Sequence, residues 1–403
     1  MGRMDLPLEL LELIFQRLCL DDVMNCRATC RSWRKAADAI FSSQLPLMLS
    51  LSTTCCGSFG SLSAPWSNHD STVLTEKWPQ DIDPSYNRVY SVQGWLVFNS
   101  FYYESVKGQT FSELLFFNPF SRARFKLPKL FLFSGRRRYY KLRVAFNSAP
   151  PGSEEFVVAF LFMFSNQDKE YYLIGPEDLK QRLAFIKLKQ GSWIESIETD
   201  EIFYDIQVDD DNKLYGLTFK HQTSVVFVFT LGGNHRDNHV VERLVMLNTI
   251  KNIDPVGRFI FSHASFKQSH QMVMDTSTGE LLLVRHWGGR CYETKGFNVF
   301  KLDRSNLKWC EIFDIGDRFL FWDFTKVSLV SAKELRLAEQ FKRGNCIFFC
   351  HANIYTSYKQ TPFRFSIRVH DMGVFFLADR TISHFSISSL PISRQNMWFS
   401  PAP

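Results

Sequence analysis

The stretch VDDDNK holds the densest group of side chains in this chain that could bind a cation or move a proton. It contains Asp209, Asp210 and Asp211 in a row. An EF-hand loop would add a central glycine and a distal glutamate, and both are missing here. Asp and Asn are also standard turn formers, so the pattern favours a hairpin turn over a metal site.

Motifs for catalysis are missing from the rest of the sequence. The ten histidines are scattered, and no HExxH, GxSxG, Walker or GxGxxG motif occurs. We therefore predict a protein that is not an enzyme and needs no cofactor or metal. One alternative stays open, because two Asp or Glu residues that meet at a central channel of the folded chain could act as the carboxylate pair of a glycosidase.

A basic stretch, SGRRRYYKLR, is the second candidate site. Arg136, Arg137 and Arg138 precede two tyrosines, a composition that suits nucleic acid or a nuclear address. The other interpretation is a solvated loop running into a strand, and we favour it because the net charge of +6 is small and diffuse for 403 residues. Nucleic acid is not an expected partner.

The cysteine pattern indicates a reducing compartment. Nine cysteines form no CxxC pair, and no Asn-x-Ser/Thr acceptor occurs. We expect the protein in the nucleus, the cytoplasm or both. The apolar run EFVVAFLFMF is too short to span a bilayer and is typical of a buried strand, so no membrane association is expected.

The N-terminal forty residues carry the spacing of three short helices. The leucine-dense stretch after Pro7 has more apolar positions than one buried face requires. Asp21 and Asp22 mark the start of a second helix, and RSWRKAADAIF forms a third with Trp33 on its apolar side. A unit this small needs a partner to bury its surplus apolar surface, or it caps the following domain.

These residues resemble an F-box from end to end. The resemblance runs through Leu6-Pro7, Glu9-Leu10-Leu11, Ile14-Phe15, Leu18 and Asp21-Asp22-Val23, and its more specific half is the closing CRSWR at 30–34. It implies docking onto a Skp-family adaptor and, through it, a cullin. The residues predicted to bind the adaptor are Leu6, Pro7, Leu10, Leu11, Ile14, Leu18 and Val23.

From about residue 86 onward the pattern changes to short strands separated by polar turns. The 40 phenylalanines favour strands over helices. Five groups of strands recur at intervals typical of a β-propeller, and LPLMLSL at 46–51 with the C-terminal tail could complete a sixth. Trp193 and Trp309 return at the same strand of their groups, at a kelch-like period; two stacked β-sandwiches are the alternative.

The second region also resembles the domain that follows the F-box in a large group of plant proteins, often called F-box/kelch-repeat proteins. The resemblance is strongest from Met272 to Cys350. The predicted fold is therefore α+β and multidomain: a three-helix F-box at 1–45, a connecting segment at 46–85 that could belong to a blade, and an all-β propeller of five to six blades at 86–395.

The resemblance implies a substrate-recognition adaptor of a Skp-cullin-F-box ubiquitin ligase, whose propeller holds a protein target. An F-box scaffold or regulator outside the ligase is the alternative. Binding hot spots favour aromatic residues and arginine, which selects loops rich in both. The predicted substrate-binding residues are Trp287, Arg290, Tyr292, Arg136, Arg137 and Arg138, with the loop at 232–239 as a further candidate.

Overall fold

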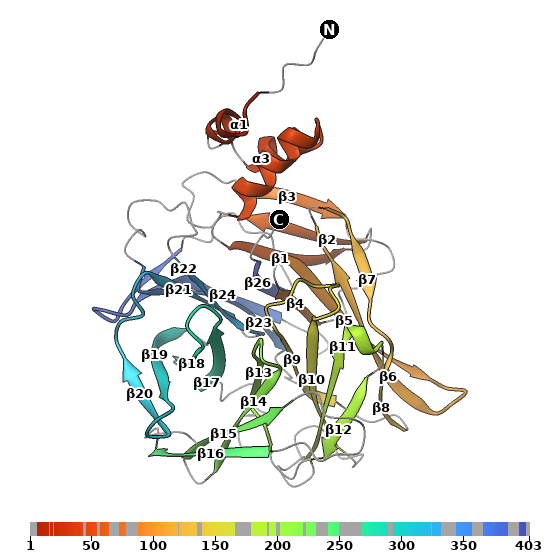
Figure 1. The fold of residues 1–403 in the computed structure, drawn as a ribbon, viewed down its shortest axis with the longest axis vertical. Helices are drawn as coiled ribbons and strands as arrows, with labels where there is room; N and C mark the ends of the chain where they lie inside the picture. Colours follow the sequence, from red (N-terminus) through yellow and green to blue (C-terminus); the bar gives the residue numbers. More distant parts are fainter. Residues whose placement is uncertain are drawn as a thin grey trace.

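The computed structural model describes most of the chain (Figure 1). The described residues are 6–15, 17–18, 20–42, 46–54, 57–63, 72–77, 88–92, 94–119, 121–134, 139–165, 179–191, 193–198, 202–220, 223–230, 241–249, 268–288, 293–323, 325–331, 344–356, 366–385 and 395–399. They form three N-terminal helices followed by a β-propeller of several sheets.

The three helices match the predicted ones and share a small core. They are α1 (Leu8–Phe15), α2 (Leu20–Arg27) and α3 (Arg31–Ser42). The carbonyl of Pro7 accepts the first hydrogen bonds of α1, from the N–H groups of Leu10 and Leu11 at 3.1 Å each. The ring of Phe15 meets Trp33 edge to face, with centroids 5.4 Å apart, so the predicted core position of Trp33 is correct.

The described strands form six sheets arranged around a ring (Figure 1). Sheet 1 consists of β4 (Arg88–Val92), β5 (Trp95–Glu104), β6 (Gln109–Phe117), β7 (Arg124–Lys126) and β8 (Leu130–Ser134). Sheet 2 consists of β9 (Tyr139–Phe146), β10 (Val157–Ser165), β11 (Leu179–Lys187) and β12 (Ile194–Glu198). Sheet 3 consists of β13 (Asp205–Val208), β14 (Lys213–Lys220), β15 (Thr223–Thr230) and β16 (Val241–Thr249).

The other three sheets complete the ring. Sheet 4 consists of β17 (Gln268–Asp275), β18 (Glu280–Gly288), β19 (Thr294–Asp303) and β20 (Lys308–Ile312). Sheet 5 consists of β21 (Arg318–Trp322), β22 (Val327–Ser331), β23 (Cys346–Thr356), β24 (Ser366–Phe376) and β25 (Thr381–His384). Sheet 6 consists of β1 (Leu47–Thr54), β2 (Gly57–Ser63), β3 (Thr72–Lys77) and the C-terminal β26 (Gln395–Phe399).

Sheet 6 joins the two ends of the chain. β26 pairs antiparallel with β1, with Leu47 opposite Phe399 and Leu51 opposite Gln395. The predicted connecting segment thus contributes three strands to a sheet, and the C-terminal tail supplies the fourth. Because the sheet is built from both ends of the chain, the ring closes non-covalently.

Sheet 5 departs from the simple meander. Its strand order is β22-β21-β23-β24-β25, and β21 runs parallel to β23 while the other neighbours are antiparallel. β22 forms a hairpin with β21 and returns to lie beside β17 of sheet 4. β22 therefore takes the innermost position of its sheet.

Several predicted strands need correction. The stretch at 88–100 is two strands rather than one, because a turn at Gly94 (φ +76°) separates β4 from β5. The apolar strand that the sequence pattern indicates at the start of FIKLKQGSWIESI (185–197) covers only the end of β11, and β8 and β22 are not indicated by it. The pattern also predicts a strand at KEYYLIG (169–175), which lies outside the described residues. The sequence pattern predicts turns at DDDNK (209–213), TSTGE (276–280) and DRSNLK (303–308), and the structure has a turn within each of them.

Two of the tight turns share the same hydrogen-bond pattern. An Asp at the start of the turn accepts backbone N–H groups, and a residue with positive φ closes the turn. Asp275 accepts the Ser277 N–H, and Gly279 (φ +71°) closes that turn. Asp209 accepts the Lys213 N–H, and Asn212 (φ +60°) lies between them. Asp side chains that accept from the next residues set the direction of each hairpin.

Candidate functional site

An exposed apolar stripe runs along α1 and the residue pair before it. Leu6, Leu10, Leu13 and Ile14 keep 44%, 48%, 55% and 42% of their surface exposed, and Pro7 is exposed beside them. In the described part of the chain, six large apolar side chains are exposed, and these four make up most of them. Single exposed leucines are ordinary, but a contiguous group marks an interaction surface.

The opposite side of α1 explains why these residues stay outside. Leu11 and Phe15 are fully buried and pack with Val23, Ala36 and Ile40 into the core of the helical domain. One helix face is thus occupied by the domain's own core, and the stripe is the surplus face that the leucine count of the sequence indicated.

The predicted adaptor-binding residues divide between these two faces. Leu6, Pro7, Leu10 and Ile14 lie on the exposed stripe. Leu11 and Val23 are 0% exposed, and Leu18 is partly buried against the same core, so these three hold the helices together. Leu13 was not in the predicted contact set, although its spacing from Leu10 places it on the same face.

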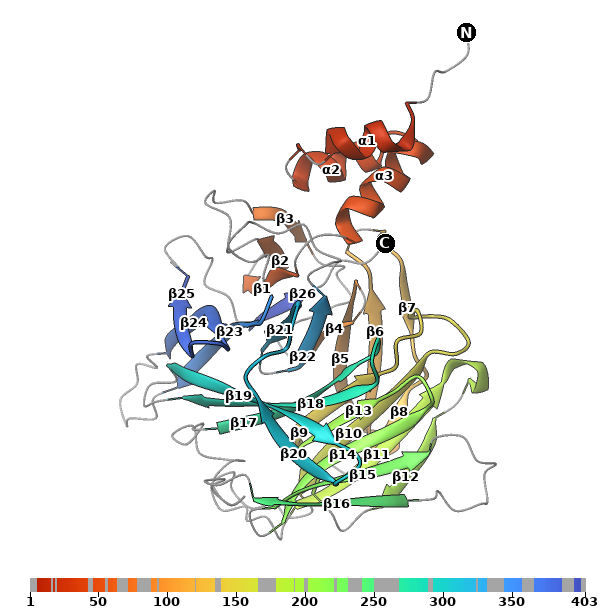
Figure 2. The same cartoon turned by 60° about the vertical axis from the view of Figure 1, so that its left-hand side comes forward.

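The helical domain is fixed to the propeller by a shared core. Ile40 of α3 belongs to one buried cluster with Leu47 and Leu49 of β1 and with Met397 and Phe399 of β26. In Figures 1 and 2 the helices lie beyond the edge of sheet 6, next to β3. Since this packing is continuous, the stripe on α1 has a defined orientation relative to the ring.

Most of the predicted substrate-binding residues lie outside the described residues. These are Arg136, Arg137, Arg138, Arg290, Tyr292 and the loop at 232–239. Their assignment stays a prediction.

Trp287 lies at the described base of its loop. Its ring covers Gly296 of β19, where a Cβ atom would come within 2.8 Å of the indole, and it remains partly exposed. Its neighbour His286 is buried, stacks on Trp322 at 4.4 Å and hydrogen-bonds Thr294 at 3.1 Å. The strand ends that carry the loop are therefore anchored in the sheet.

In the acidic turn at 209–211, Asp209 and Asp210 form hydrogen bonds that hold the fold together. Asp209 accepts hydrogen bonds from the Lys213 N–H at 2.7 Å and from the Tyr215 hydroxyl at 2.9 Å. Asp210 accepts from both the N–H and the hydroxyl of Ser148, at 2.9 and 2.6 Å, which ties sheet 3 to sheet 2. Burial and the hydrogen bond with Asp209 raise the pKa of Tyr215 to about 12, so its hydroxyl stays a donor.

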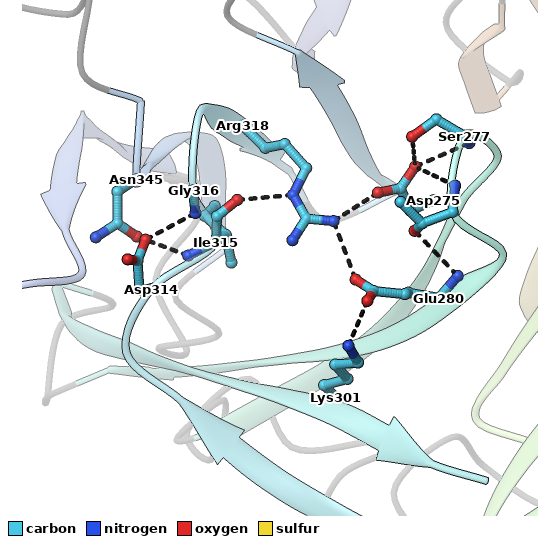
Figure 3. A network of polar contacts seen from close by, with 10 residues as sticks. Asp275, Ser277, Glu280, Lys301, Asp314, Ile315, Gly316, Arg318 and Asn345 are labelled. Atoms are coloured by element: carbon cyan, nitrogen blue, oxygen red, sulfur yellow. Dashed lines mark hydrogen bonds and ion pairs between the residues drawn. The ribbon is translucent and has the colours of Figure 1, made fainter.

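In the described part of the chain, Asp275 and Glu280 share one cation between sheets 4 and 5 (Figure 3). Arg318 donates to Asp275 at 2.5 Å and to Glu280 at 3.2 Å, and Lys301 also binds Glu280. Burial alone would raise the pKa of Asp275, but hydrogen bonds from Ser277 and Arg318 outweigh it and the pKa is lowered.

The same cations act on the second carboxylate of the pair. The hydrogen bond from Lys301 and then that from Arg318 lower the pKa of Glu280 against its burial. A glycosidase needs one carboxylic acid with a raised pKa to protonate the leaving group. Since both pKa values are lowered, this pair is suited to linking the sheets and not to acid catalysis.

No group of three or more His, Cys, Asp or Glu residues that could hold a metal ion occurs in the described part of the chain. Among the helices that the structure describes, none has the length and hydropathy needed to cross a bilayer.

These features define a protein with an F-box-like helical domain and a β-propeller. The F-box-like family model matches residues 4–45. The KIB1-4 β-propeller model matches residues 38–376, most of the chain, and the chain belongs to that family. The kelch-like period stays a prediction.

No curated protein sequence matches this chain. Among solved structures, the chain is similar to the β-propeller domain of the Trilobed protease from Pyrococcus furiosus (8% identity, 74% of this chain and 70% of that chain, TM-score 0.29). It is also similar to the GH43 protein BlXynB from Bacillus licheniformis (9%, 79% and 57%, TM-score 0.36) and to a protein from Lactobacillus plantarum (12%, 85% and 82%, TM-score 0.35). At these scores nothing about activity follows for this chain.

Proposed function

We propose that the protein is a non-catalytic substrate adaptor of a Skp-cullin-F-box ubiquitin ligase. The exposed stripe of Leu6, Leu10, Leu13 and Ile14 is the observation that carries the proposal. It lies within the F-box-like match, and α1 has no packing partner for it in the described part of the chain. An apolar face of a Skp-family adaptor is the partner that the F-box match implies.

The shared core between α3 and sheet 6 supports the second half of the proposal. A ligase adaptor has to hold its target at a fixed position relative to the scaffold. Because Ile40, Leu47 and Phe399 pack in one cluster, docking through α1 orients the whole ring. The propeller then presents a protein target through its loops, which is where recognition residues concentrate in folds of this kind.

The test is binding of the purified protein to a purified Skp-family adaptor. Replacing Leu10 and Ile14 together by Asp places two charges in the apolar contact and should abolish binding, because a buried anchor contributes at least about 2 kcal/mol. Both side chains are exposed in the free protein, so the variant should keep the wild-type melting temperature. Leu6→Ala with Pro7→Ala should weaken the same contact.

Val106→Asp is the matched control. Val106 is a single apolar residue, 93% exposed, in the turn between β5 and β6, far in sequence from the stripe. Adaptor binding by the Leu10/Ile14 variant at wild-type affinity would refute the proposal. Affinity purification that recovers the propeller's partners without adaptor or cullin would favour a scaffold acting outside the ligase.

A further inference from the structure

Lys326 lies inside the ring, directly before the inner strand β22. Its Nζ atom is 5.4 Å from the centre of the Phe146 ring, which belongs to β9 of sheet 2. The contacts between sheets give their order around the ring. Sheet 3 lies between sheets 2 and 4, and sheet 4 contacts sheet 5 through β22. Sheet 6 lies between sheets 5 and 1 through β26. Sheets 2 and 5 are thus opposite one another, so the lysine side chain reaches across the middle.

The backbone of Lys326 is held in place by Asp323. One carboxylate oxygen of Asp323 accepts hydrogen bonds from the Thr325 N–H at 2.7 Å, the Thr325 hydroxyl at 2.5 Å and the Lys326 N–H at 3.0 Å. The other oxygen accepts from the Trp398 N–H of β26 at 3.1 Å. Four donors therefore satisfy Asp323, and the turn that aims Lys326 at the axis is fixed.

The second nearby carboxylate is also occupied. One oxygen of Asp205 lies 3.4 Å from Nε of Arg143, and the other accepts the Met272 N–H at 2.6 Å. Asp205 is buried, and it links β9, β13 and β17 through these contacts. Asp205 thus forms an ion pair with Arg143, and its charge also acts on Lys326 from a distance.

The ammonium group of Lys326 is left without a direct protein acceptor in the described part of the chain. It carries three donors, and the aromatic face of Phe146 accepts none of them as a conventional hydrogen bond. Burial lowers the pKa of Lys326, and the carboxylates of Asp205 and Asp323 oppose this from a distance. The Lys326 side chain is only partly exposed, so water solvates its ammonium group less well than that of a surface lysine, and a cation placed there without a direct partner reduces the stability of the fold.

We propose that the Lys326 ammonium binds a small oxyanion, a carboxylate or a phosphate, on the axis of the propeller. An oxyanion would supply a negative charge and hydrogen-bond acceptors for the ammonium group. Asp205 already contacts Arg143 and the Met272 N–H, and Asp323 already accepts backbone N–H groups. Gln271 adds a polar lining at the same inner level. Its amide donates to the Asp323 carbonyl at 2.7 Å, and its buried Oε1 has no partner in the described residues. This site is independent of adaptor docking through α1.

A purely structural role for Lys326 makes the opposite prediction for stability. If the lysine were an ion-pair partner of Asp205 or Asp323, its removal would leave a buried charge unpaired and lower the melting temperature strongly. If the ammonium awaits a ligand, Lys326→Met keeps the packing of the stem, removes an unpaired cation, and should melt at the wild-type temperature or above it in anion-free buffer.

The experiment measures melting temperature against sodium phosphate and sodium citrate, each compared with sodium chloride at equal ionic strength. We expect a saturable rise of at least about 2 °C for the wild type with one of the two anions, and the anion that acts identifies phosphate or carboxylate as the preferred group. The rise should vanish in Lys326→Met and persist in Lys107→Met, which removes an exposed lysine 3.3 Å from Glu104.

Three results would overturn the proposal: no saturable rise for the wild type, the same rise in Lys326→Met, or a strongly lowered melting temperature of Lys326→Met without anion. If the Met variant does not fold, Lys326→Gln removes the charge and keeps a polar end, and the same comparisons apply to it. Each result leaves the adaptor-binding test unaffected, since Lys326 is far in sequence from the stripe on α1 and is not part of it.

Discussion

Arg318 joins two sheets through a single guanidinium group. It donates to Asp275 and Glu280 beside the turn between β17 and β18, and its Nε donates to the Ile315 carbonyl at 2.7 Å. The Arg318 and Asp275 side chains are 21% and 6% exposed, so water screens the pair less than it screens a surface pair. Such a contact adds to stability because it also satisfies buried acceptors.

Arg318→Met should lower the free energy of unfolding at pH 7 by about 1–3 kcal/mol, the usual cost of leaving a charged acceptor unpaired. The effect should depend on pH. The folded pKa values of Asp275 and Glu280 lie below their ordinary values of 3.8 and 4.5, so their contribution is present above those values and is lost as the pH falls through the folded pKa values. Thermal unfolding at pH 7 and below pH 4 should show the difference shrinking in acid.

Arg380→Met is the control for this prediction, because Arg380 and Glu311 form a more exposed pair at 3.6 Å. We expect a change within about 0.5 kcal/mol. Equal losses for the two arginine variants, or a pH-independent loss for Arg318→Met, would show that the linkage between sheets 4 and 5 does not rest on these charges.

The apolar residues of α1 show which features of a helix can be predicted from its sequence. Helical spacing predicted that α1 has two apolar faces, and it does. It could not assign Leu11 and Val23 to the inner face, because that depends on how α2 and α3 cross α1. The same uncertainty left Leu13 out of the predicted contacts, although it is the most exposed residue of the stripe.

Strands with strong apolar alternation were predictable from sequence, and those that depend on tertiary context were not. The four strands of sheet 3 and the four of sheet 4 each overlap an apolar segment of the sequence between 203 and 314 that indicated a strand. β22 has the short sequence VSLVS, and its inner place is set by the hairpin with β21 and the parallel pairing of β21 with β23. That order arises from contacts distant in sequence, which no local pattern encodes.

The C-terminal strand β26 makes a prediction at this scale. Trp398 is 4% exposed, its indole N–H donates to the Trp322 carbonyl at 3.1 Å, and its ring meets Phe321 edge to face at 5.3 Å. Trp398→Ala should destabilise the protein by about 3–5 kcal/mol, because it removes packing between sheets 5 and 6 where the ring closes. Chemical denaturation measures this.

Phe313→Ala is the control for Trp398→Ala. Phe313 is also a large aromatic residue but is 55% exposed, so its loss should change stability by less than about 0.5 kcal/mol. If Trp398→Ala unfolded at the same denaturant concentration as the control, closure through β26 would contribute little to the fold.

The two faces of the ring differ in how many hydrogen bonds join their turns to neighbouring sheets. On one face, hydrogen bonds join the tight turns: Asp210 binds Ser148 of the preceding sheet, and Arg304 donates to the Gly279 carbonyl at 3.2 Å. The turn after β13 and the turn after β17 both lie there. In sheets 1 to 4, the second strand counted outward from the inner strand begins at this face. β1 is the second strand of sheet 6, next to the inner strand β26, so it begins at this face too, and the helical domain joins the propeller there. The end of β18 and the start of β19 lie on the opposite face.

That arrangement sharpens the prediction for target recognition at 286–293. The triple change of Trp287, Arg290 and Tyr292 to Ala also removes the indole that covers Gly296, so it should lower thermal stability as well as capture. Arg290→Ala with Tyr292→Ala leaves that packing intact and is the cleaner variant. Quantitative affinity purification should show adaptor recovery unchanged and a subset of co-purifying proteins lost, since arginine and tyrosine dominate hot spots. Lys107→Ala, on the β5–β6 turn, is the control. An identical set of captured proteins from the double variant and the wild type would exclude this loop as the recognition site.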